Sequence, residues 1–313
     1  MNTLAGTREV SASTPGTTPA RDRRILVLLS DGFGGRGGIA KFNRDFLRAL
    51  CSHPRTEQVV ALPRLAPDPL GPLHERLDYH SEGLGGVGAY ARALARILVR
   101  EAPFDLVVCG HINLLPFAAL SALRYRAPQV LTVHGVDVWQ PTARRLTNRL
   151  TPRVDHFIAV SEYTKERFLG WARLRPEQGH VLPNCVSIDA FTPGPKSAAL
   201  LERYGLSGRT VLLTVARLSA SERYKGVDEV LEGLPALAEQ VPSISYLIVG
   251  EGDDRQRLEQ KCRDLGINDR VVFAGYIAES EKVEHYRLAD AFVMPGRGEG
   301  FGVVYIEAMA CGV

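Results

Sequence analysis

The sequence predicts an α/β fold in which two Rossmann-like domains face a cleft, the second domain being incomplete. Apolar runs of strand length alternate with segments that carry apolar residues at helical spacing. The alternation occurs in two cycles, and Pro193-Gly194-Pro195 lies between them. The chain has 313 residues, a length that suits two domains of ordinary size.

The first cycle begins with the apolar run 24–30, which has the composition of a strand buried on both faces. A glycine-rich turn follows, and then a segment with apolar residues at positions 39, 42, 46, 47 and 50, which predicts a helix over 39–50. We expect further strands at 58–62, 106–109, 130–133 and 156–160, and helices at 86–100, 114–124 and 162–171.

In the second cycle we expect strands at 210–215, 244–249, 271–273 and 291–294, and helices at 226–240, 253–265, 279–288 and 303–311. Helices of this length between strands give right-handed crossovers and a parallel sheet. Gly312-Val313 resembles a turn into another strand, so we expect the second domain to lack its last elements. The predicted division is a disordered tail (1–22), a first domain (23–193) and a second domain (194–313).

Composition excludes several classes of protein. Hydrophobic residues make up 45% and charged residues 23%, which is typical of globular proteins. The longest apolar runs have strand length, so we expect no segment that spans a bilayer. Five scattered cysteines without a CxxC pair favour a reducing, cytoplasmic compartment over a disulfide framework or a zinc site.

Charge is distributed unevenly along the chain. Residues 23–193 hold 22 Lys and Arg against 15 Asp and Glu, whereas residues 194–313 hold 14 against 18. This asymmetry indicates two domains with different partners, although random surface composition would also explain it.

Three segments have residues suited to ligand binding, each with an ordinary structural alternative. The stretch 34–38 is rich in glycine before a helix, and it includes Gly37 and Gly38; it would let an anion approach the helix N-terminus, or simply form a tight turn. His134 follows the strand 130–133, where open α/β sheets bind ligands, or it is an internally bonded turn residue. Arg217 and Lys225 follow the strand 210–215 and suit a diphosphate, or they lie in a solvated loop.

The stretch 295–312 carries the strongest signal. A strand ends before a glycine-rich loop with Glu299, and a helix begins near Gly302 or Val303. Free N–H groups at that helix N-terminus suit a phosphate, and Glu307, about one turn into the helix, would accept two ribose hydroxyls. Glu299 would reach another part of the ligand. The pattern therefore indicates a nucleotide-sugar site.

The sequence resembles glycosyltransferase family 4, the retaining transferases of GT-B fold. The matching stretches occur in the family's order from residue 25 to residue 313: Gly37-Gly38-Ile39, His134-Gly135, 160–165, Leu182-Pro183-Asn184, Arg217 with Lys225-Gly226, 249–252, and the Glu-x7-Glu pair Glu299 and Glu307. The sequence departs from the family at Asn184-Cys185, where Asn-Gly is common, and at its end, where the family continues with further elements.

The resemblance implies a role for each matching residue. Arg217 and Lys225 would hold the donor diphosphate, with backbone N–H groups of Gly302 and Val303. Glu299 would bind the transferred sugar, Glu307 the ribose, and His134 would lie near the reactive centre. Other expected substrate-binding residues are Gly37, Gly38, Gly300 and Phe301 for the donor or acceptor, and Tyr276 and Ile277 for the base.

The implied function is transfer of a hexose from a UDP- or GDP-sugar to a glycan or lipid-linked acceptor in cell-surface polysaccharide or glycolipid synthesis. No cofactor or metal is expected, in agreement with the absence of Asp-x-Asp, and no nucleic acid partner is expected. If the natural protein ended at residue 313, we would expect weak or no transfer. The alternatives are a non-catalytic nucleotide-sugar-binding remnant and a nucleotide-sugar epimerase.

Positive charge in the first domain suits an acceptor at an anionic membrane. The segment 143–153 holds four arginines near His134 and would contact headgroups, unless it is only a solvated helix face. The expected location is therefore the cytoplasm, including the inner face of the cell membrane as a peripheral protein.

Overall fold

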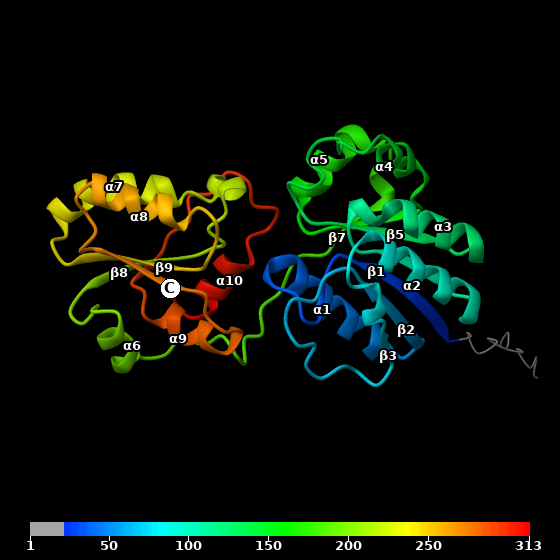
Figure 1. Ribbon diagram of the computed structural model, residues 1–313, viewed down its shortest axis with the longest axis horizontal. Coiled ribbons are helices and arrows are strands. Elements are labelled where there is room, and N and C mark those ends of the chain that lie inside the picture. The colour runs from blue at the N-terminus through cyan, green and yellow to red at the C-terminus, as the bar shows by residue number, and fades with distance from the viewer. Residues whose placement is uncertain (1–21) are drawn as a thin grey trace, which may run out of the picture.

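The computed structural model describes residues 22–313, and Figure 1 shows two α/β units joined by an extended segment. The tail predicted at 1–22 lies outside the described residues except for Asp22. The predicted fold class is confirmed, because each unit is built on a parallel sheet and the second sheet is the smaller one.

The first sheet has seven parallel strands in the order β3-β2-β1-β4-β5-β6-β7. The strands are β1 (Arg23–Leu29), β2 (Thr56–Pro63), β3 (Leu77–Tyr79), β4 (Leu106–Cys109), β5 (Gln129–Val133), β6 (His156–Ala159) and β7 (Gly179–Val181). The helices are α1 (Gly37–Ser52), α2 (Val87–Arg100), α3 (Leu115–Tyr125), α4 (Arg145–Leu150) and α5 (Glu162–Ala172).

Both faces of the first sheet are covered, which explains the continuous apolar composition of β1. Leu26 and Leu28 belong to a core that also holds buried residues of α2, α3 and α5. Val27 and Leu29 point to the opposite core, formed with α1 and β2. Alternation of side chains along a strand thus supplies two hydrophobic cores from one segment.

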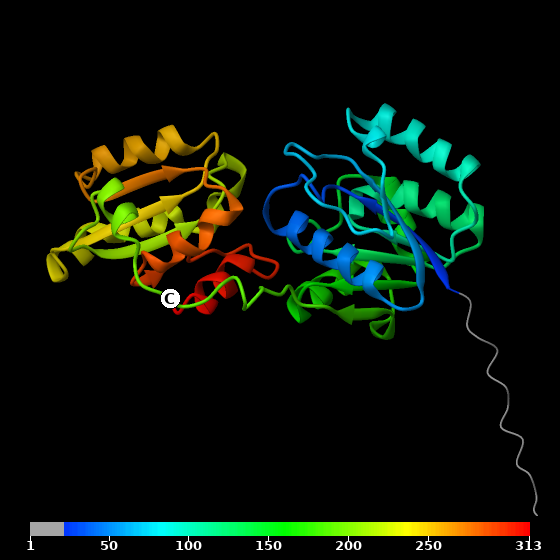
Figure 2. The ribbon, with the colours of Figure 1, turned by 90° about the horizontal axis from the view of Figure 1, so that it is seen from below.

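The second sheet has four parallel strands in the order β10-β9-β8-β11. They are β8 (Thr210–Val215), β9 (Ile244–Val249), β10 (Val271–Gly275) and β11 (Ala291–Phe292). The helices of this unit are α6 (Ala198–Arg203), α7 (Val227–Gln240), α8 (Arg255–Asp264), α9 (Lys282–Arg287) and α10 (Val303–Ala310). Figure 2 shows helices on both sides of this sheet as well, with α10 on the side of the first unit.

The elements differ from the expectations mainly where they are short. The strands β3 and β7 have three residues each and lie at the two edges of the first sheet, so they give almost no periodic signal. The helix expected over 279–288 is divided into a 3-10 helix, η6 (Glu279–Glu281), and α9. The strand expected over 291–294 pairs only through Ala291 and Phe292. The domain boundary that we predict after residue 193 falls between β7 and α6.

Candidate active site

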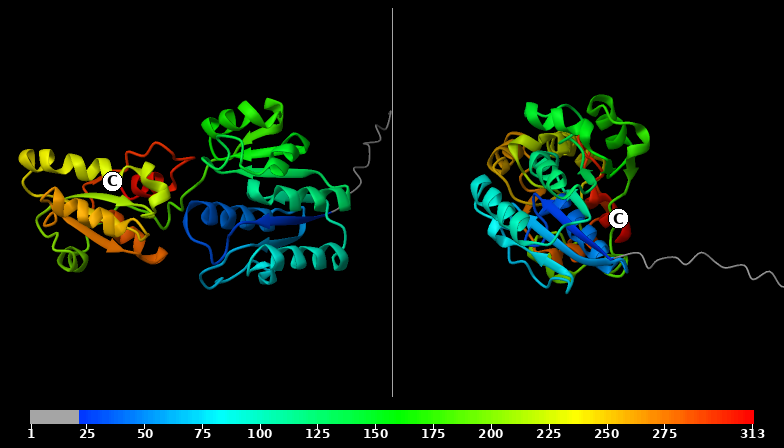
Figure 3. Two further views of the ribbon diagram at one scale, coloured as in Figure 1. Left: turned by 45° about the horizontal axis from the view of Figure 1, so that its top comes forward. Right: turned by 90° about the vertical axis from the view of Figure 1, so that its right-hand side faces the viewer.

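The residues singled out in the sequence follow strand ends that meet at one edge of each sheet. The glycine-rich turn follows β1 and His134 follows β5, whereas Arg217 follows β8 and Glu299 lies between β11 and α10. Parallel strands end at the same edge, and ligands of open α/β sheets bind there. The two edges face one another where the units meet (Figure 3, left).

Two helix N-termini meet between the units. The helix α1 begins at Gly37, whose φ of 84° is left-handed, and α10 begins after Gly302, whose φ is 79°. A Cβ added at Gly38 would lie 3.9 Å from Cγ2 of Val303, so the first turns of α1 and α10 are neighbours. Unpaired N–H groups and the positive ends of two helix dipoles therefore favour an anion at this position.

His134 is held by the first unit in a defined tautomer. Its Nε2 lies 2.9 Å from the carbonyl oxygen of Gly110, and a carbonyl only accepts, so we assign the proton to Nε2. The ring of Phe42 packs edge-on against the imidazole at 5.2 Å between centroids. This leaves Nδ1 as the acceptor that His134 offers to a hydroxyl.

The loop with Glu299 contacts the first unit through its backbone. Ser161, the N-cap residue of α5, donates a hydrogen bond of 2.8 Å from Oγ to the carbonyl oxygen of Gly300. A Cβ at Gly300 would lie 1.9 Å from the carbonyl oxygen of His134, and one at Gly135 would lie 2.6 Å from Cα of Gly300. Both positions therefore require glycine, and the loop joins the two units beside His134.

Arg217 and Lys225 do come together, and an acid that we did not predict joins them. The carboxylate of Glu222 contacts Nη2 of Arg217, and its Oε2 lies 3.0 Å from Nζ of Lys225. The side chain of Lys225 is mostly buried, whereas that of Arg217 is 70% exposed. Glu222 lies three residues before Lys225, but the backbone at Glu222 is not helical, so this spacing is no regular helical pattern and gave no clear signal in the sequence.

Glu299 lies in the electrostatic field of the same cluster. Burial raises the pKa of its carboxyl, Lys225 acts in the opposite direction, and Glu222 adds to the increase. Arg217 and Lys225, which the resemblance assigns to the diphosphate, and Glu299, which it assigns to the transferred sugar, thus lie in one charged neighbourhood.

Glu307 lies in α10 and contacts residues of α9, not Arg217 or Lys225. Its side chain is fully buried, and its Oε2 accepts a hydrogen bond of 2.7 Å from the hydroxyl of Tyr286. Its Oε1 is 3.6 Å from Nζ of Lys282 and has no hydrogen-bond partner in the described part of the chain. Burial, with a smaller effect of Glu307, raises the pKa of Tyr286. The predicted contact of Glu307 with a ribose therefore requires access to this buried oxygen.

The loop expected to contact the base carries an aromatic ring that faces the first unit. Tyr276 is half exposed, and the guanidinium of Arg36 lies 4.6 Å from the centre of its ring. Arg36 is also paired with Asp68, and this hydrogen bond lowers the pKa of the Asp68 carboxyl. Ile277 packs against the core of the second unit, and Phe301 is partly exposed in the loop.

Two further titratable residues, Asp31 and His111, lie near His134 and were not predicted from the sequence. Burial raises the pKa of Asp31, which accepts a hydrogen bond of 2.8 Å from the hydroxyl of Ser30. Burial lowers the pKa of His111, whose ring lies 6.4 Å from that of His134. Asp31 follows β1 and His111 follows β4. A position just after a strand of the first sheet was therefore the signal by which the sequence could have indicated each of them.

One group of metal-ligating side chains lies elsewhere within residues 22–313. Ligand atoms of Asp78, His80 and Glu101 lie within 4.8 Å of one another. Arg24 donates a hydrogen bond of 2.8 Å to Oε2 of Glu101, so a guanidinium already binds this carboxylate. The group includes none of the predicted site residues. Among the described helices, none has the length and hydropathy needed to cross a membrane.

Comparison with known proteins identifies the family. The model described as Glycosyltransferase Family 4 matches residues 36–190, and the model described as Glycosyl transferases group 1 matches residues 201–313. The chain belongs to glycosyltransferase family 4. The chain is therefore a glycosyltransferase, and the curated relatives of the chain are hexosyltransferases.

Two of the relatives are GDP-mannose-dependent alpha-(1-6)-phosphatidylinositol monomannoside mannosyltransferases. That of Mycobacterium tuberculosis is 30% identical to this glycosyltransferase over 308 residues, which cover 93% of this chain and 79% of the relative. That of Mycolicibacterium smegmatis is 38% identical over 212 residues, or 63% of this chain. The second match spans about half of the relative's length, 54%.

Solved structures show the same fold at lower identity. The structure of Anabaena HepE in complex with UDP has a TM-score of 0.72 and 23% identity, and the match covers 92% of this glycosyltransferase and 79% of that chain. Sucrose-phosphate synthase from Thermosynechococcus elongatus has a TM-score of 0.74 and 20% identity, with 93% and 80% covered.

Proposed function

We propose that this glycosyltransferase moves a mannosyl group from GDP-mannose to a lipid-linked acceptor and retains the configuration at the anomeric carbon. The observation that carries the proposal is the cluster of Arg217, Lys225 and Glu299 beside the N-terminus of α10, opposite His134 of the other unit. GDP-mannose is proposed because the two curated relatives described above are named for this donor.

The cluster suits a departing diphosphate. The bond from the anomeric carbon to the diphosphate oxygen breaks, the acceptor oxygen forms the new bond on the same face of the sugar, and the diphosphate takes the acceptor's proton. Arg217, Lys225 and the first N–H groups of α10 would stabilise the negative charge that develops on the diphosphate. Stabilisation of this charge by groups already in place would supply most of the rate enhancement.

The remaining residues would orient the two substrates. Glu299 would accept hydrogen bonds from the transferred sugar, and Nδ1 of His134 would accept one from a hydroxyl of the sugar. Oε1 of Glu307, the buried oxygen without a partner, would accept from the ribose. Gly37 and Gly38 would let the donor phosphates or the acceptor approach the start of α1.

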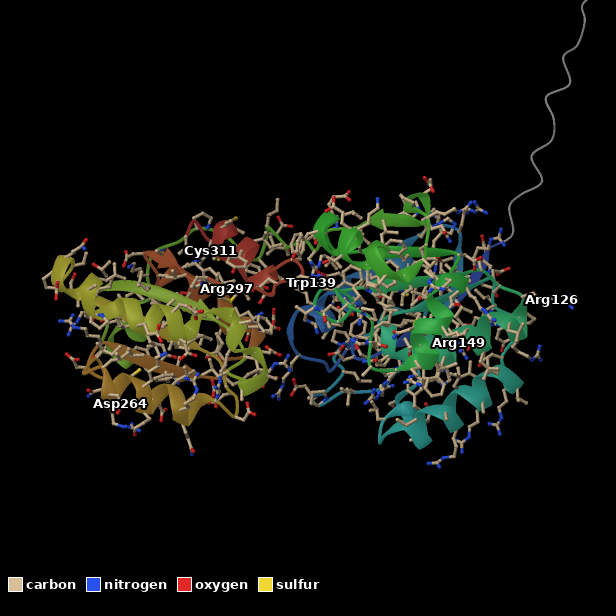
Figure 4. All side chains as sticks on the ribbon, turned by 90° about the horizontal axis from the view of Figure 1, so that it is seen from above. Arg126, Trp139, Arg149, Asp264, Arg297 and Cys311 are labelled. Atoms are coloured by element: carbon tan, nitrogen blue, oxygen red, sulfur yellow. The ribbon has the colours of Figure 1, made fainter. Side chains whose placement is uncertain are left out.

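The surface of the first unit supports an acceptor at an anionic membrane. The helices α2, α3 and α4 are neighbours (Figure 1), and their segments 87–100, 115–126 and 143–153 contain no acidic residue. Their exposed arginines are Arg92, Arg96, Arg100, Arg124, Arg126, Arg144, Arg145, Arg149 and Arg153, and none of these forms an ion pair within residues 22–313. Figure 4 labels Arg126 and Arg149 on this unit.

Exposed apolar side chains lie among these arginines. Val99 is 82% exposed and Leu123 is 78% exposed, and Leu120 and Leu146 are also largely exposed. A surface that combines apolar side chains with unpaired cations suits the headgroup region of an anionic bilayer. This surface supports our proposal that the protein binds peripherally at the cytoplasmic face of the membrane.

A donor screen with a matched pair of variants tests the proposal. We expect transfer from GDP-mannose, and not from UDP-glucose, to an extracted anionic glycolipid acceptor. Glu299→Gln should reduce transfer about 100-fold or more because it removes the carboxylate from the sugar. Glu229→Gln, an exposed acid at the start of α7, changes the charge equally and should leave the rate unaltered. Transfer that persists in Glu299→Gln would contradict the role assigned to Glu299. A product with the β configuration at the anomeric carbon would contradict retention.

A further inference from the structure

Glu222 occupies the space between the two cations that we assign to the diphosphate. It contacts Arg217 through Oε1 and Lys225 through Oε2, so one carboxylate bridges both cations. Its side chain is only 14% exposed, and among the residues that the structure describes Oε2 has no hydrogen-bond partner with good geometry. The carboxylate thus lies against the same two cations that a diphosphate would contact.

The backbone around Glu222 is held on both sides, so the carboxylate stays near the cations. Its N–H donates a hydrogen bond of 2.8 Å to the carbonyl oxygen of Ser219. Glu222 lies at a kink of the 3-10 segment η5 (Ala220–Lys225), with φ of −119° and ψ of 25°. The next residue, Arg223, is anchored to Asp254 by two hydrogen bonds of 3.1 and 2.8 Å. Gly226 ends the segment in a left-handed conformation with φ of 89°.

The charges of the cluster balance before any ligand binds. Arg217 and Lys225 supply two positive charges, and Glu222 and Glu299 supply two negative charges when ionised. A diphosphate that binds the cations therefore meets a nearby negative carboxylate. The repulsion grows with the charge of the ligand and is strong in a partly buried site.

We propose that Glu222 is a positioning residue that orients Arg217 and Lys225 and weakens the binding of the nucleoside diphosphate product more than that of the nucleotide-sugar donor. The inference rests on the proposed function. In the donor, the sugar esterifies the terminal phosphate. When the anomeric bond breaks, this phosphate gains an ionisable oxygen, and loss of its proton to solvent gives the product one more negative charge. The fixed carboxylate of Glu222 therefore favours release of the product over release of the donor.

Calorimetry on the Glu222→Gln variant tests this inference. Glutamine keeps the size of the side chain and an oxygen that accepts from Arg217, but it removes the charge. We expect GDP to bind about tenfold more tightly, and GDP-mannose only about threefold more tightly, since GDP has the greater charge. UDP and UDP-glucose form a second pair of probes. Glu229→Gln is the control, because it removes an exposed acid from the adjacent helix α7 without an ion pair to either cation.

The outcomes separate this inference from the proposed function. If the wild-type chain bound none of the four nucleotides, the proposed donor site and the inference would both be wrong. If it bound them and the Glu222→Gln variant changed the affinity for product and donor equally, only the inference would be overturned. The inference would also be overturned if Glu222→Gln, with unchanged circular dichroism and melting temperature, bound the nucleotides more weakly than wild type. Glu222 would then only order Arg217 and Lys225. In turnover, the ratio of the product inhibition constant to the donor KM should fall in parallel.

Discussion

At the scale of single residues, the chemistry of the site follows from side chains that are only partly visible in the sequence. Arg217, Lys225 and Glu299 stand out because each follows a strand and has a charge that suits a nucleotide-sugar. Glu222 does not stand out, because its importance comes from burial against two cations, and burial of one acid in an irregular segment leaves no periodic pattern. The full burial of Glu307 was equally hidden, since it depends on Tyr286 of another helix.

Glu299 should lower the stability of the protein near neutral pH. Burial raises its pKa in the folded chain, so the folded state binds the proton more readily than the unfolded state. The free energy of unfolding then falls as pH rises from the ordinary carboxyl pKa through the folded-state pKa. Glu299→Gln removes this penalty, while Lys225 keeps its contact with Glu222.

We therefore expect Glu299→Gln to melt at a higher temperature than wild type at pH 7, with the difference shrinking towards pH 4, where the wild-type carboxyl is protonated. Thermal unfolding across this pH range measures the effect. Glu166→Gln, at an exposed position inside α5, should show no such trend. A destabilised Glu299→Gln variant at pH 7 would show that the ionised carboxylate is stabilised by its neighbours.

At the scale of elements, the sequence was most informative for long, periodic segments. The apolar strand β1 and the helices α1 and α2 were predicted to within about two residues because their patterns extend over several turns or pleats. The edge strands β3 and β7 have three residues each, so only pairing with an existing strand makes them regular. The packing of the Gly300 loop against the residues that follow β5 and β6 was not predictable either, because these contacts join segments more than 130 residues apart.

Two glycines of the second unit should respond to alanine in opposite ways. Gly300→Ala would place a methyl group 1.9 Å from the carbonyl oxygen of His134, so the loop with Glu299 must move away from the first unit. Displacement of a substrate-positioning group by about 1 Å can reduce the rate about 100-fold. Gly233→Ala in α7 meets open space and should stabilise the helix by about 1 kcal/mol.

Steady-state kinetics and thermal unfolding of both variants measure these effects. Full transfer by Gly300→Ala would show that the contact between the loop and the first unit does not position Glu299. Destabilisation by Gly233→Ala would contradict the open surroundings of that position.

At the scale of the whole molecule, the uneven charge of the two halves coincides with a basic surface on the first unit. The positive excess of residues 23–193 includes nine arginines on α2, α3, α4 and the residues that flank them, and these arginines have no ion-pair partner among residues 22–313. The sequence showed the excess but not that these three helices lie together, because their adjacency follows from the strand order of the sheet. The two-domain architecture itself was predictable, since the repeated alternation of strand and helix leaves few other topologies.

Binding to vesicles should depend on this surface. We expect Arg145→Ala with Arg149→Ala to weaken binding to vesicles that contain anionic lipid roughly 30-fold, at about 1 kcal/mol for each arginine. Sedimentation with anionic and with purely zwitterionic vesicles measures the effect, which should decline with added salt. The control is Arg203→Ala with Arg209→Ala, two exposed positions of the second unit. Equal binding by both double variants would contradict the membrane surface.

The contact between Gly135 and Gly300 has a practical consequence for recombining enzymes of this kind. It is made by main-chain atoms of two glycines, and the hydroxyl of Ser161 supports it through a hydrogen bond to Gly300. A chimaera that couples this first unit to the second unit of a homologue should keep that junction, provided that both glycines and Ser161 are preserved. Exchange of the second unit in this way would alter which sugar is transferred while the contact between the two units is kept.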